Sequence, residues 1–461
     1  MENITQLKYP QDFSLNQCTL ITSLNTPFDF RPAVMKLTLF QDIYSPVMTG
    51  NIIVTDSSGF INNMSFNGNE FITIKLGKPG NLNQDIDKTF RIFKVSDRKQ
   101  IKDQNEMYML HFCSEELLLS EQYKISKSYK GKKISDIVSD ILTTYLKVNV
   151  TKFDPSNISD YIEETQGMYN FIVPNFKPFE ALNWLTTYAI SNDPKTTGSP
   201  YLFYETNSGF NFKSLQSMVQ VEPSQILNYA VQNLNLPNDD TVADMDYYTN
   251  HNVLSYEHVR NFDMLDSIMS GTFANKLVTV DPIDRIYNTT NFDYNQYIQT
   301  ASILNSSGLL SNTQNRFLDT TNSTYDSVYK VMVTNTGQNK VSYIQTHQND
   351  IKDINIEVST PNRVSQISQL NTIKMKIIIP GNPTIDVGDV ITFNFLEMNS
   401  DPTGRKNDRY YSGNYLVTAI RHKVDQEGGF LTLLEISKES MNNPYINPNN
   451  TIPAWNKIRS A

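Results

Sequence analysis

Short segments of alternating apolar and polar residues dominate the first quarter of the chain. Residues 34–40, 51–56 and 70–76 each alternate in this way, and turn residues such as those at 67–69 separate them. Strict alternation is the pattern of a β-strand with one buried face. Five or six such strands at regular spacing predict an N-terminal antiparallel β-barrel or sandwich over residues 1–115.

Helical periodicity then replaces the alternation. The apolar side chains of residues 133–147 recur at helical spacing and fall on one face. A second helix is expected to begin near Pro178, because proline is favoured in the first turn. Residues 201–205 and 209–213 follow as two strands around a short Thr-Asn-Ser connection. The pattern predicts an α+β domain of helix–helix–hairpin type, inserted at residues 116–225.

The next region, residues 226–361, is less regular and is expected to form a mixed domain. Residues 263–269 fit a helical turn capped by Gly271, and residues 273–281 fit a strand. The segment 300–328 is rich in Ser, Asn and Thr, so we expect a loop or a segment that a partner orders.

The clearest β pattern lies near the C-terminus, over residues 362–440. Alternating runs are separated there by turns, including Pro-Gly-Asn-Pro at 380–383 and glycines at 388 and 413. This pattern predicts a second antiparallel barrel. The apolar face assigned to its core consists of Ile373, Met375, Ile377 and Ile379. The expected fold class is therefore β-rich α+β, with two small antiparallel β-barrel domains and the inserted helix–helix–hairpin domain.

The final segment, residues 441–461, contains several prolines and asparagines and is expected to form an extended tail. Tyr445 and Trp455 are its candidate anchors on a neighbouring molecule.

Composition narrows the class of protein. With 461 residues the chain is long enough for about two to four domains. The formal net charge of −9 disfavours sequence-specific binding of nucleic acid, which needs a basic surface. We see no secretory signal and no apolar run of roughly 18 residues that would span a membrane. The two cysteines, Cys18 and Cys113, are expected to be buried or inert thiols.

Candidate catalytic groups are few. Three adjacent carboxylate pairs occur at 115–116, 163–164 and 239–240, but adjacent residues of a strand face opposite sides, so ordinary solvated charge is the expected role. The five histidines have no metal-ligand spacing, and His111 and His422 lie in predicted strands. Gly-x-Ser-x-Gly and phosphate-loop motifs are absent from the sequence. We therefore expect no enzyme, no cofactor and no metal site.

Several motifs within residues 30–440 carry a resemblance to a known family. They are the segment Leu-Phe-Gln-Asp-Ile-Tyr-Ser-Pro-Val-Met-Thr-Gly at 39–50, Phe-Asp-Met-Leu at 262–265, and the strand-turn patterns at 377–389 and 411–422. Together with the order of the parts, they resemble the central baseplate hub protein of contractile-tailed bacteriophages. The layout is also similar to the late control protein of other phages and to the hub part of secretion-system spike proteins.

The resemblance implies a function in assembly. Members of that family are homotrimers whose two barrels per subunit form a pseudo-sixfold ring, which joins the hexameric tail tube to the threefold central spike and lines the DNA channel. The implied partners are the tail tube or a tube initiator, the spike and other baseplate wedge proteins, with DNA passing without specific binding and without stable insertion into a membrane. The implied location is the virion tail, after synthesis in the host cytoplasm.

Two alternatives stay open. The first is the hub of a non-contractile tail or of a phage-like injection or secretion apparatus, and a nearby sheath gene would separate it from the contractile machine. A tail-associated cell-wall hydrolase is the other alternative, and it requires a pair of carboxylates in a cleft.

Overall fold

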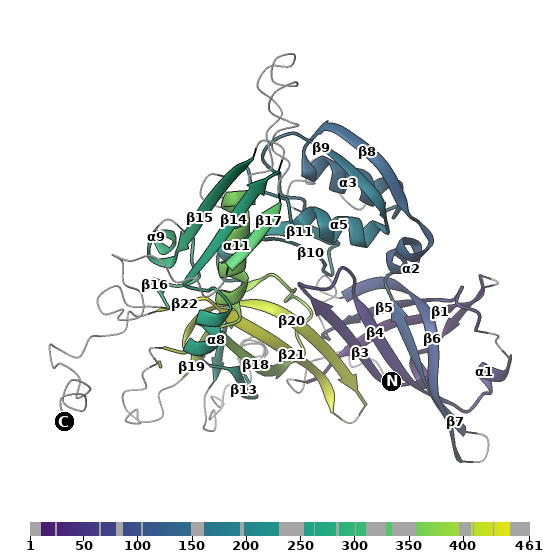
Figure 1. Ribbon diagram of the computed structural model, residues 1–461. Coiled ribbons are helices and arrows are strands. Elements are labelled where there is room, and N and C mark those ends of the chain that lie inside the picture. Colours follow the sequence, from purple (N-terminus) through teal and green to yellow (C-terminus); the bar gives the residue numbers. More distant parts are fainter. Residues whose placement is uncertain are drawn as a thin grey trace.

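A computed structural model of the chain is shown in Figure 1. It describes residues 11–23, 25–63, 66–79, 86–102, 105–148, 161–193, 198–229, 253–261, 263–282, 285–299, 301–309, 329–333, 356–395, 407–408, 410–426 and 428–442.

Seven strands near the N-terminus form one unit, called here the N-terminal β unit, and pair in the antiparallel order β3-β4-β7-β6-β5-β1-β2. Their alternation sends one face of each strand into a shared core that includes Leu39, Ile52 and Ile72. The elements are β1 (Ser14–Ile21), β2 (Pro27–Asp29), a 3-10 turn (Arg31–Ala33), β3 (Val34–Asp42), β4 (Thr49–Asp56), α1 (Phe60–Asn63), β5 (Phe71–Gly77), β6 (Ile86–Lys102) and β7 (Asn105–Cys113).

The inserted module contains the two helices and the hairpin expected from the sequence. The apolar stripe of α3, including Ile137, Val138 and Ile141, is buried against the rest of the module. A second antiparallel pair, β8 with β9, covers the helices and was not predicted. The elements are α2 (Glu115–Gln122), β8 (Ile125–Lys132), α3 (Ile134–Thr144), β9 (Tyr169–Phe176), α5 (Pro178–Thr186), β10 (Tyr201–Glu205), β11 (Phe210–Ser214) and α6 (Leu215–Val219).

The C-terminal β unit has the predicted core face, since Ile373, Met375, Ile377 and Ile379 are all buried. It also contains two strands from the region that we assigned to a mixed domain at 226–361. One pairs in parallel with β19 and the other pairs antiparallel with β18. The boundary expected near residue 361 is therefore wrong for these strands. The unit consists of β12 (Gln225–Tyr229), β13 (Ser255–Arg260), β18 (Ile373–Pro380), β19 (Val390–Phe395), β20 (Gly413–Asp425) and β21 (Gly429–Lys438).

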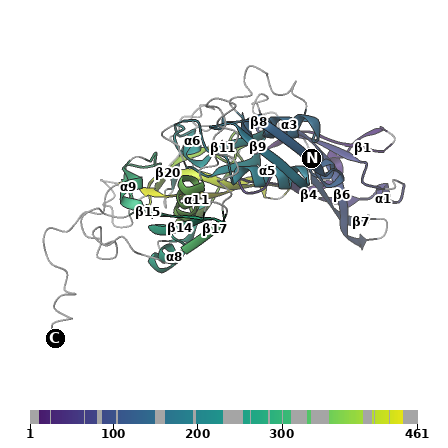
Figure 2. The same ribbon diagram turned by 45° about the horizontal axis from the view of Figure 1, so that its top comes forward.

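The remaining elements form a smaller layer beside the C-terminal β unit. A sheet of order β15-β14-β17 packs on the helix α11, which the sequence analysis missed and which crosses the expected domain boundary. Figure 2 shows this layer at one end of an elongated molecule, with the N-terminal β unit at the other. The elements are α8 (Met264–Met269), β14 (Ala274–Asp281), β15 (Ile286–Asp293), α9 (Tyr294–Ile298), β16 (Ser307–Gly308), β17 (Tyr329–Val333), α11 (Ile356–Leu370) and β22 (Ser440–Met441).

Two expectations concern segments that are only partly described. Of the polar segment 300–328, the described residues 301–309 include β16, which pairs with β22. The rest of that segment lies outside the described residues, as do Tyr445 and Trp455.

The two β units share one sheet. Seven consecutive residue pairs, from Ala419 with Asp42 to Asp425 with Lys36, join β20 to β3 and make a sheet of 13 strands. Side chains cross the same junction, because Val424 and Phe430 belong to the core of the N-terminal β unit. The β-rich character is thus confirmed, but we expected two separate barrels and the strands form one continuous sheet. Among the described strands the pairing order does not close on itself, so closure of each barrel stays a prediction.

A substitution at Gly50 tests how closely β4 packs in this sheet. A Cβ atom at this position would lie 2.6 Å from the carbonyl oxygen of Thr38 and would overlap the ring of Phe112. We expect Gly50→Ala to lower the free energy of unfolding by about 1–3 kcal/mol, measured by urea denaturation, because a rigid neighbour leaves the added methyl no room. Gly428→Ala is the control, since its added Cβ would meet nothing closer than 3.7 Å. Equal effects of the two variants would contradict this account.

Candidate functional site: a polar junction of three units

The turn between β10 and β11 lies where the inserted module meets the N-terminal β unit. Glu205, at the end of β10, has a side chain only 5% exposed. Its carboxylate accepts hydrogen bonds from Lys88 Nζ (2.6 Å), Ser114 Oγ (2.6 Å) and the backbone N–H of Met48 (2.8 Å). Lys88 Nζ also donates to the carbonyl oxygen of Thr206 at 2.5 Å. One carboxylate of the module therefore binds three separate segments of the N-terminal β unit and its boundary.

The same turn also contacts the C-terminal β unit. Asp386 Oδ1 accepts hydrogen bonds from the backbone N–H of Asn207 (3.2 Å) and from Gln41 Nε2 (3.1 Å). Gln41 belongs to β3 and is buried, and its Oε1 accepts a bond from the N–H of Val387 at 3.4 Å. The turn and Gln41 together link all three units through polar contacts, next to the place where β3 pairs with β20.

Local hydrogen bonds give this turn a defined shape. Thr206 and Gly209 exchange backbone N–H to carbonyl bonds of 2.8 and 3.2 Å. Asn211 Nδ2 donates to Thr206 Oγ1 and to the carbonyl oxygen of Gly209, both at 3.1 Å. Gly388, in the C-terminal β unit, lies close to Tyr204 of β10. Its φ of +89° favours glycine, and an added Cβ would lie 2.5 Å from the Tyr204 hydroxyl, so there is no space for a side chain.

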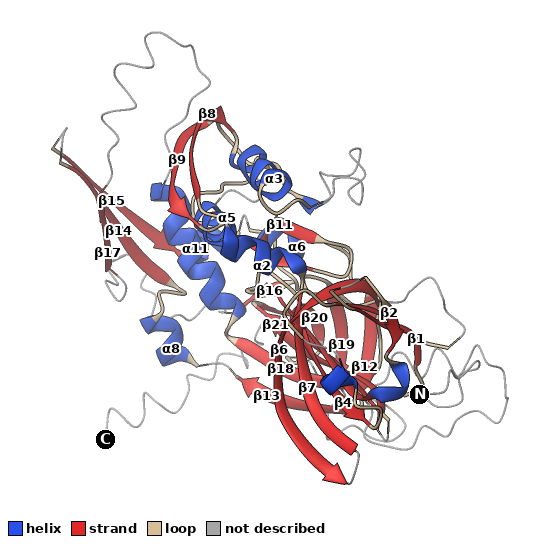
Figure 3. Ribbon diagram, turned by 90° about the vertical axis from the view of Figure 1, so that its right-hand side faces the viewer, coloured by secondary structure: helices blue, strands red, loops and turns tan. Residues whose placement is uncertain are grey.

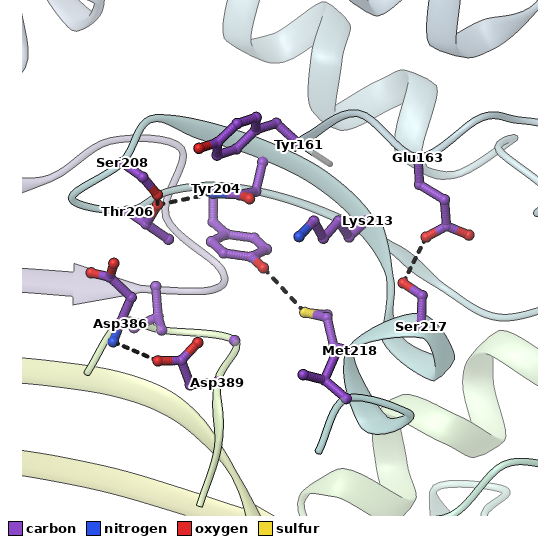
Figure 4. A pocket seen from close by; sticks show the side chains of 14 residues that line it. Tyr161, Glu163, Tyr204, Thr206, Ser208, Lys213, Ser217, Met218, Asp386 and Asp389 are labelled. Carbon is purple, nitrogen blue, oxygen red and sulfur yellow. Dashed lines mark hydrogen bonds between the residues drawn. The ribbon is translucent and has the colours of Figure 1, made fainter. Parts of the chain in front are cut away.

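A cavity of about 420 Å³ lies beside the turn, between the inserted module and the C-terminal β unit. Figure 4 shows its walls, where the Tyr204 hydroxyl donates to Met218 Sδ (3.3 Å) and Asp389 Oδ2 accepts from the backbone N–H of Asp386 (2.9 Å). Burial raises the pKa of Asp386, and burial raises the pKa of Asp389 to about 6. Asp386 and Asp389 on the cavity wall therefore hold their protons more strongly than exposed carboxyl groups do.

Glu163 corrects the expectation that the adjacent carboxylate pairs are solvated charge. Its side chain, on the wall of the same cavity, accepts hydrogen bonds from five groups at 2.7–3.1 Å. The donors are Ser191 Oγ, Tyr201 OH, Ser214 N, Ser214 Oγ and Ser217 Oγ. Glu163 thus ties α6 and the hairpin together. Its neighbour Glu164 is exposed and pairs with Lys133, as expected for surface charge.

The two carboxylates of the adjacent pair at 115–116 also have different roles. Glu115 pairs with Arg91 at 3.1 Å and its side chain is 43% exposed. Burial, followed by the nearby charge of Glu205, raises the pKa of Glu116 to about 7. Glu116 therefore belongs electrostatically to the junction. The third pair, at 239–240, lies outside the described residues.

The cysteines and the described histidines occupy structural positions. Cys18 and Cys113 are buried free thiols, as expected, and burial raises the pKa of each to about 12. His422 lies in the core, where its Nδ1 lies 3.1 Å from Thr432 Oγ1, and His111 Nε2 lies 2.8 Å from Ser96 Oγ. Within the described part of the chain, no three His, Cys, Asp or Glu side chains are grouped to hold a metal ion.

Several known proteins are similar in structure to this chain. The sequence matches no protein-family model and no curated protein. Its structure is similar to a tail protein from Neisseria meningitidis MC58, with a TM-score of 0.50 and 9% identity, over 93% of this chain and 97% of that one. The 43 kDa tail protein of prophage MuSo2 from Shewanella oneidensis matches over 92% and 99% of the two chains, with a TM-score of 0.49 and 9% identity.

A third similar structure is a component of the Escherichia coli type VI secretion system, described as similar to T4 bacteriophage tail proteins. It matches over 90% of this chain and 75% of that one, with a TM-score of 0.41 and 8% identity. At such low identity the likeness establishes the fold. The chain has the fold of the Neisseria tail protein, and the resemblance to baseplate hub proteins seen in the sequence is confirmed at the level of the fold.

The ion pair at the junction can be tested by removing one charge. Glu205→Gln leaves Lys88, whose side chain is 14% exposed, without its counter-ion. We expect the free energy of unfolding to fall by about 3–5 kcal/mol in urea denaturation, because an uncompensated buried charge is costly.

The matched control is Asp87→Asn, which removes the partner of Lys75 from the neighbouring position of the same strand. That pair is 3.5 Å long and the Asp87 side chain is 57% exposed, so its loss should change stability far less. A loss at Glu205 no larger than that at Asp87 would show that the buried pair does not hold the junction.

The raised pKa of Glu116 gives the junction a pH dependence. Between its ordinary value of 4.5 and about 7, folded Glu116 keeps a proton that the unfolded chain has released. Its contribution to stability therefore falls as the pH rises through this window. We expect the stability of the wild type relative to Glu116→Gln to decrease between about pH 5 and about pH 8 in urea denaturation. Glu115→Gln is the control, and parallel pH profiles for wild type and Glu116→Gln would contradict the assignment.

Proposed function

We propose that the protein is a structural hub of a phage tail baseplate, a trimeric adaptor that joins the hexameric tail tube to the threefold central spike. The observation that carries the proposal is the continuous 13-stranded sheet, in which one chain supplies two β units side by side. Three chains would then offer six β units to a hexameric tube, which is the symmetry that such an adaptor has to match. The tail-protein fold, matched over nearly the full length of both chains, supports the same function.

The mechanism is mechanical. In a tail that contracts, force must pass from the tube through the hub to the spike without pulling the hub apart. The β3–β20 ladder shares load between the two β units along seven residue pairs. The polar contacts of Glu205 and Asp386 hold the inserted module against both units, so the module moves with the sheet.

Passage of DNA fits the charge of the chain. A net charge of −9 gives a surface that repels the phosphate backbone on average, and this favours transit over sticking. In this proposal DNA passes through the lumen of the ring and the protein does not bind it specifically.

The proposed partners are the tail tube or its initiator, the central spike and other baseplate wedge proteins, and the proposed location is the virion tail. Stable membrane insertion is not part of the proposal. In the described portion of the chain, no helix combines the length and apolar character needed to cross a membrane.

Two alternative functions compete with the hub of a contractile tail. A hub of a non-contractile tail, or of a phage-like injection or secretion apparatus, would use the same architecture, and a sheath gene beside the hub gene would favour the contractile machine.

A tail-associated hydrolase gains one observation from the structure, because Glu163, Asp386 and Asp389 line one cavity. Glu163 is already fully engaged in structural hydrogen bonds, so we favour the hub. Clearing of host cell wall in a zymogram, lost in Asp389→Asn, would favour the hydrolase.

The hub proposal predicts a defined mass and a defined pair of partners. Light scattering on the purified chain should give about three times its 52.8 kDa, because an adaptor to a threefold spike has to be a trimer. Co-purification with the tail tube protein and with the spike protein, each expressed separately, is the second readout. A stable single chain that binds neither protein would overturn the proposal.

A further inference from the structure

A small cavity lies where three parts of the fold meet, away from the junction at Glu205. Its volume is about 10 Å³, and its walls include Gln216 of α6, Gln366 of α11 and Glu439. α6 belongs to the inserted module, α11 packs in the smaller layer, and Glu439 directly follows β21 of the C-terminal β unit. The cavity therefore joins segments that are far apart in the sequence.

The side chains around this cavity are buried but only partly bonded. Gln216 and Gln366 are each 3% exposed, and Glu439 is 9% exposed. Four of their atoms have no hydrogen-bond partner among the described residues, namely Gln216 Oε1, Glu439 Oε2 and both amide atoms of Gln366. An unpaired buried polar atom lowers stability, so nearly all such atoms in folded proteins bond to protein or to ordered water. Their convergence on one cavity indicates a shared partner.

The remaining polar atoms of two of these side chains are bonded, and this fixes their positions. Gln216 Nε2 donates to the Tyr297 hydroxyl of α9 at 2.7 Å. Glu439 Oε1 accepts from the backbone N–H of Leu304 at 2.7 Å and from Ser440 Oγ at 3.3 Å. Gln216 Oε1 and Glu439 Oε2 are then left to bind a further partner.

The size of the cavity and the types of its polar atoms favour water as that partner. A cavity needs about 10–15 Å³ to hold one water, which makes about two to four hydrogen bonds to polar groups. Burial raises the pKa of Glu439, and this favours the protonated carboxyl, whose O–H can donate.

The hydrogen-bonding capacity of a water also matches the site. The site offers two donors, the Glu439 O–H and the Gln366 amide N–H, and two acceptors, Gln216 Oε1 and Gln366 Oε1. A water accepts two hydrogen bonds and donates two, so one water can pair with all four groups. A sodium or ammonium ion accepts no hydrogen bond and would leave the N–H of Gln366 unpaired.

We propose that the cavity binds one ordered water, which links the inserted module, α11 and the end of the C-terminal β unit through Gln216, Gln366 and Glu439. The site goes beyond the proposed function, because it belongs to the fold of a single chain. It gives the inserted module a further polar attachment. Figure 3 shows α11 beside the helices of this module, and Arg363 of α11 also donates to the carbonyl oxygen of Thr186 in α5.

Gln366→Met tests the site, because methionine has nearly the shape of glutamine but only a weak hydrogen-bond acceptor. Magnetic relaxation dispersion of water oxygen-17 counts long-lived internal waters, and we expect one fewer in the variant than in the wild type. The equilibrium constant of unfolding, from urea denaturation, should rise at least about fivefold, because Gln216 and Glu439 lose their shared partner. In a dry cavity the same substitution would remove two unpaired atoms and stabilise the fold.

Two further variants separate loss of the water from other effects. Glu439→Gln keeps a donor at the cavity and an acceptor for the N–H of Leu304, so it should retain the water count of the wild type. Gln122→Met makes the same exchange as Gln366→Met at an exposed position of α2 and should leave both the water count and the unfolding midpoint unchanged. Circular dichroism verifies that each variant is folded, and a high-resolution crystal structure of the wild type shows the site directly.

Several results would overturn the inference. They are equal water counts in the wild type and Gln366→Met, a higher urea midpoint of that variant, loss of the water in Glu439→Gln, or a crystal structure in which Gln366 bonds directly to Gln216 without a water. A wild-type stability that changes when choline replaces sodium at constant ionic strength would show a bound cation instead. The mass of the chain and its binding to tube and spike proteins are separate measurements, so the hub can stand where this site fails.

Discussion

Seven consecutive residue pairs between β3 and β20 hold the first and last thirds of the chain in one sheet. Without them the N-terminal and C-terminal β units would be two domains on a tether, free to change their relative orientation. With them, backbone hydrogen bonds fix that orientation, and side chains from β20 and β21 complete the core of the N-terminal β unit. The inserted module can then be placed against both units at once, because the two surfaces that it touches have a fixed geometry.

The contacts of the module show how the placement is made specific. Lys88 and Glu205 are both largely removed from water, and the desolvation of a buried pair offsets most of its attraction. Such a pair makes the placement of the hairpin specific, because any other position of the hairpin would bury a charge without a partner. Gln41 and Asp386 extend the same logic to the C-terminal β unit. The hairpin turn thus has one position at which the Glu205 carboxylate and the backbone N–H of Asn207 both find their partners.

The sequence predicted those parts of the fold in which a local pattern decides the structure. The strands at 34–40, 51–56 and 70–76 alternate clearly, and α3 has a continuous apolar stripe, so both types were found. β8 was missed because lysines occupy three of its eight positions and only Ile125 and Tyr129 are buried. β13 has no apolar face of its own, since Tyr256 and His258 supply its inward contacts, and α11 combines a weak amphipathic pattern with an internal proline.

The junction is harder still to predict. Glu205 ends a hairpin strand and resembles any surface glutamate, and its partners Met48, Lys88 and Ser114 come from distant segments. The five donors to Glu163 likewise converge only in the folded chain. Ser214 and Ser217, at the end of β11 and in the short helix that follows it, are the one local hint, because small hydroxyl side chains often satisfy a buried carboxylate. Tertiary pairing of charges leaves no periodic trace in a sequence.

The pairing of β3 with β20 also determines when the sheet can be completed during synthesis. Asp42 leaves the ribosome long before Ala419, with which it pairs. At roughly 5–20 residues per second the wait is tens of seconds, during which β3 is an unpaired edge able to join strands of other molecules. The finished sheet can form only when almost the whole chain is available. Products that stop before β20 therefore lack the frame on which the inserted module is seated.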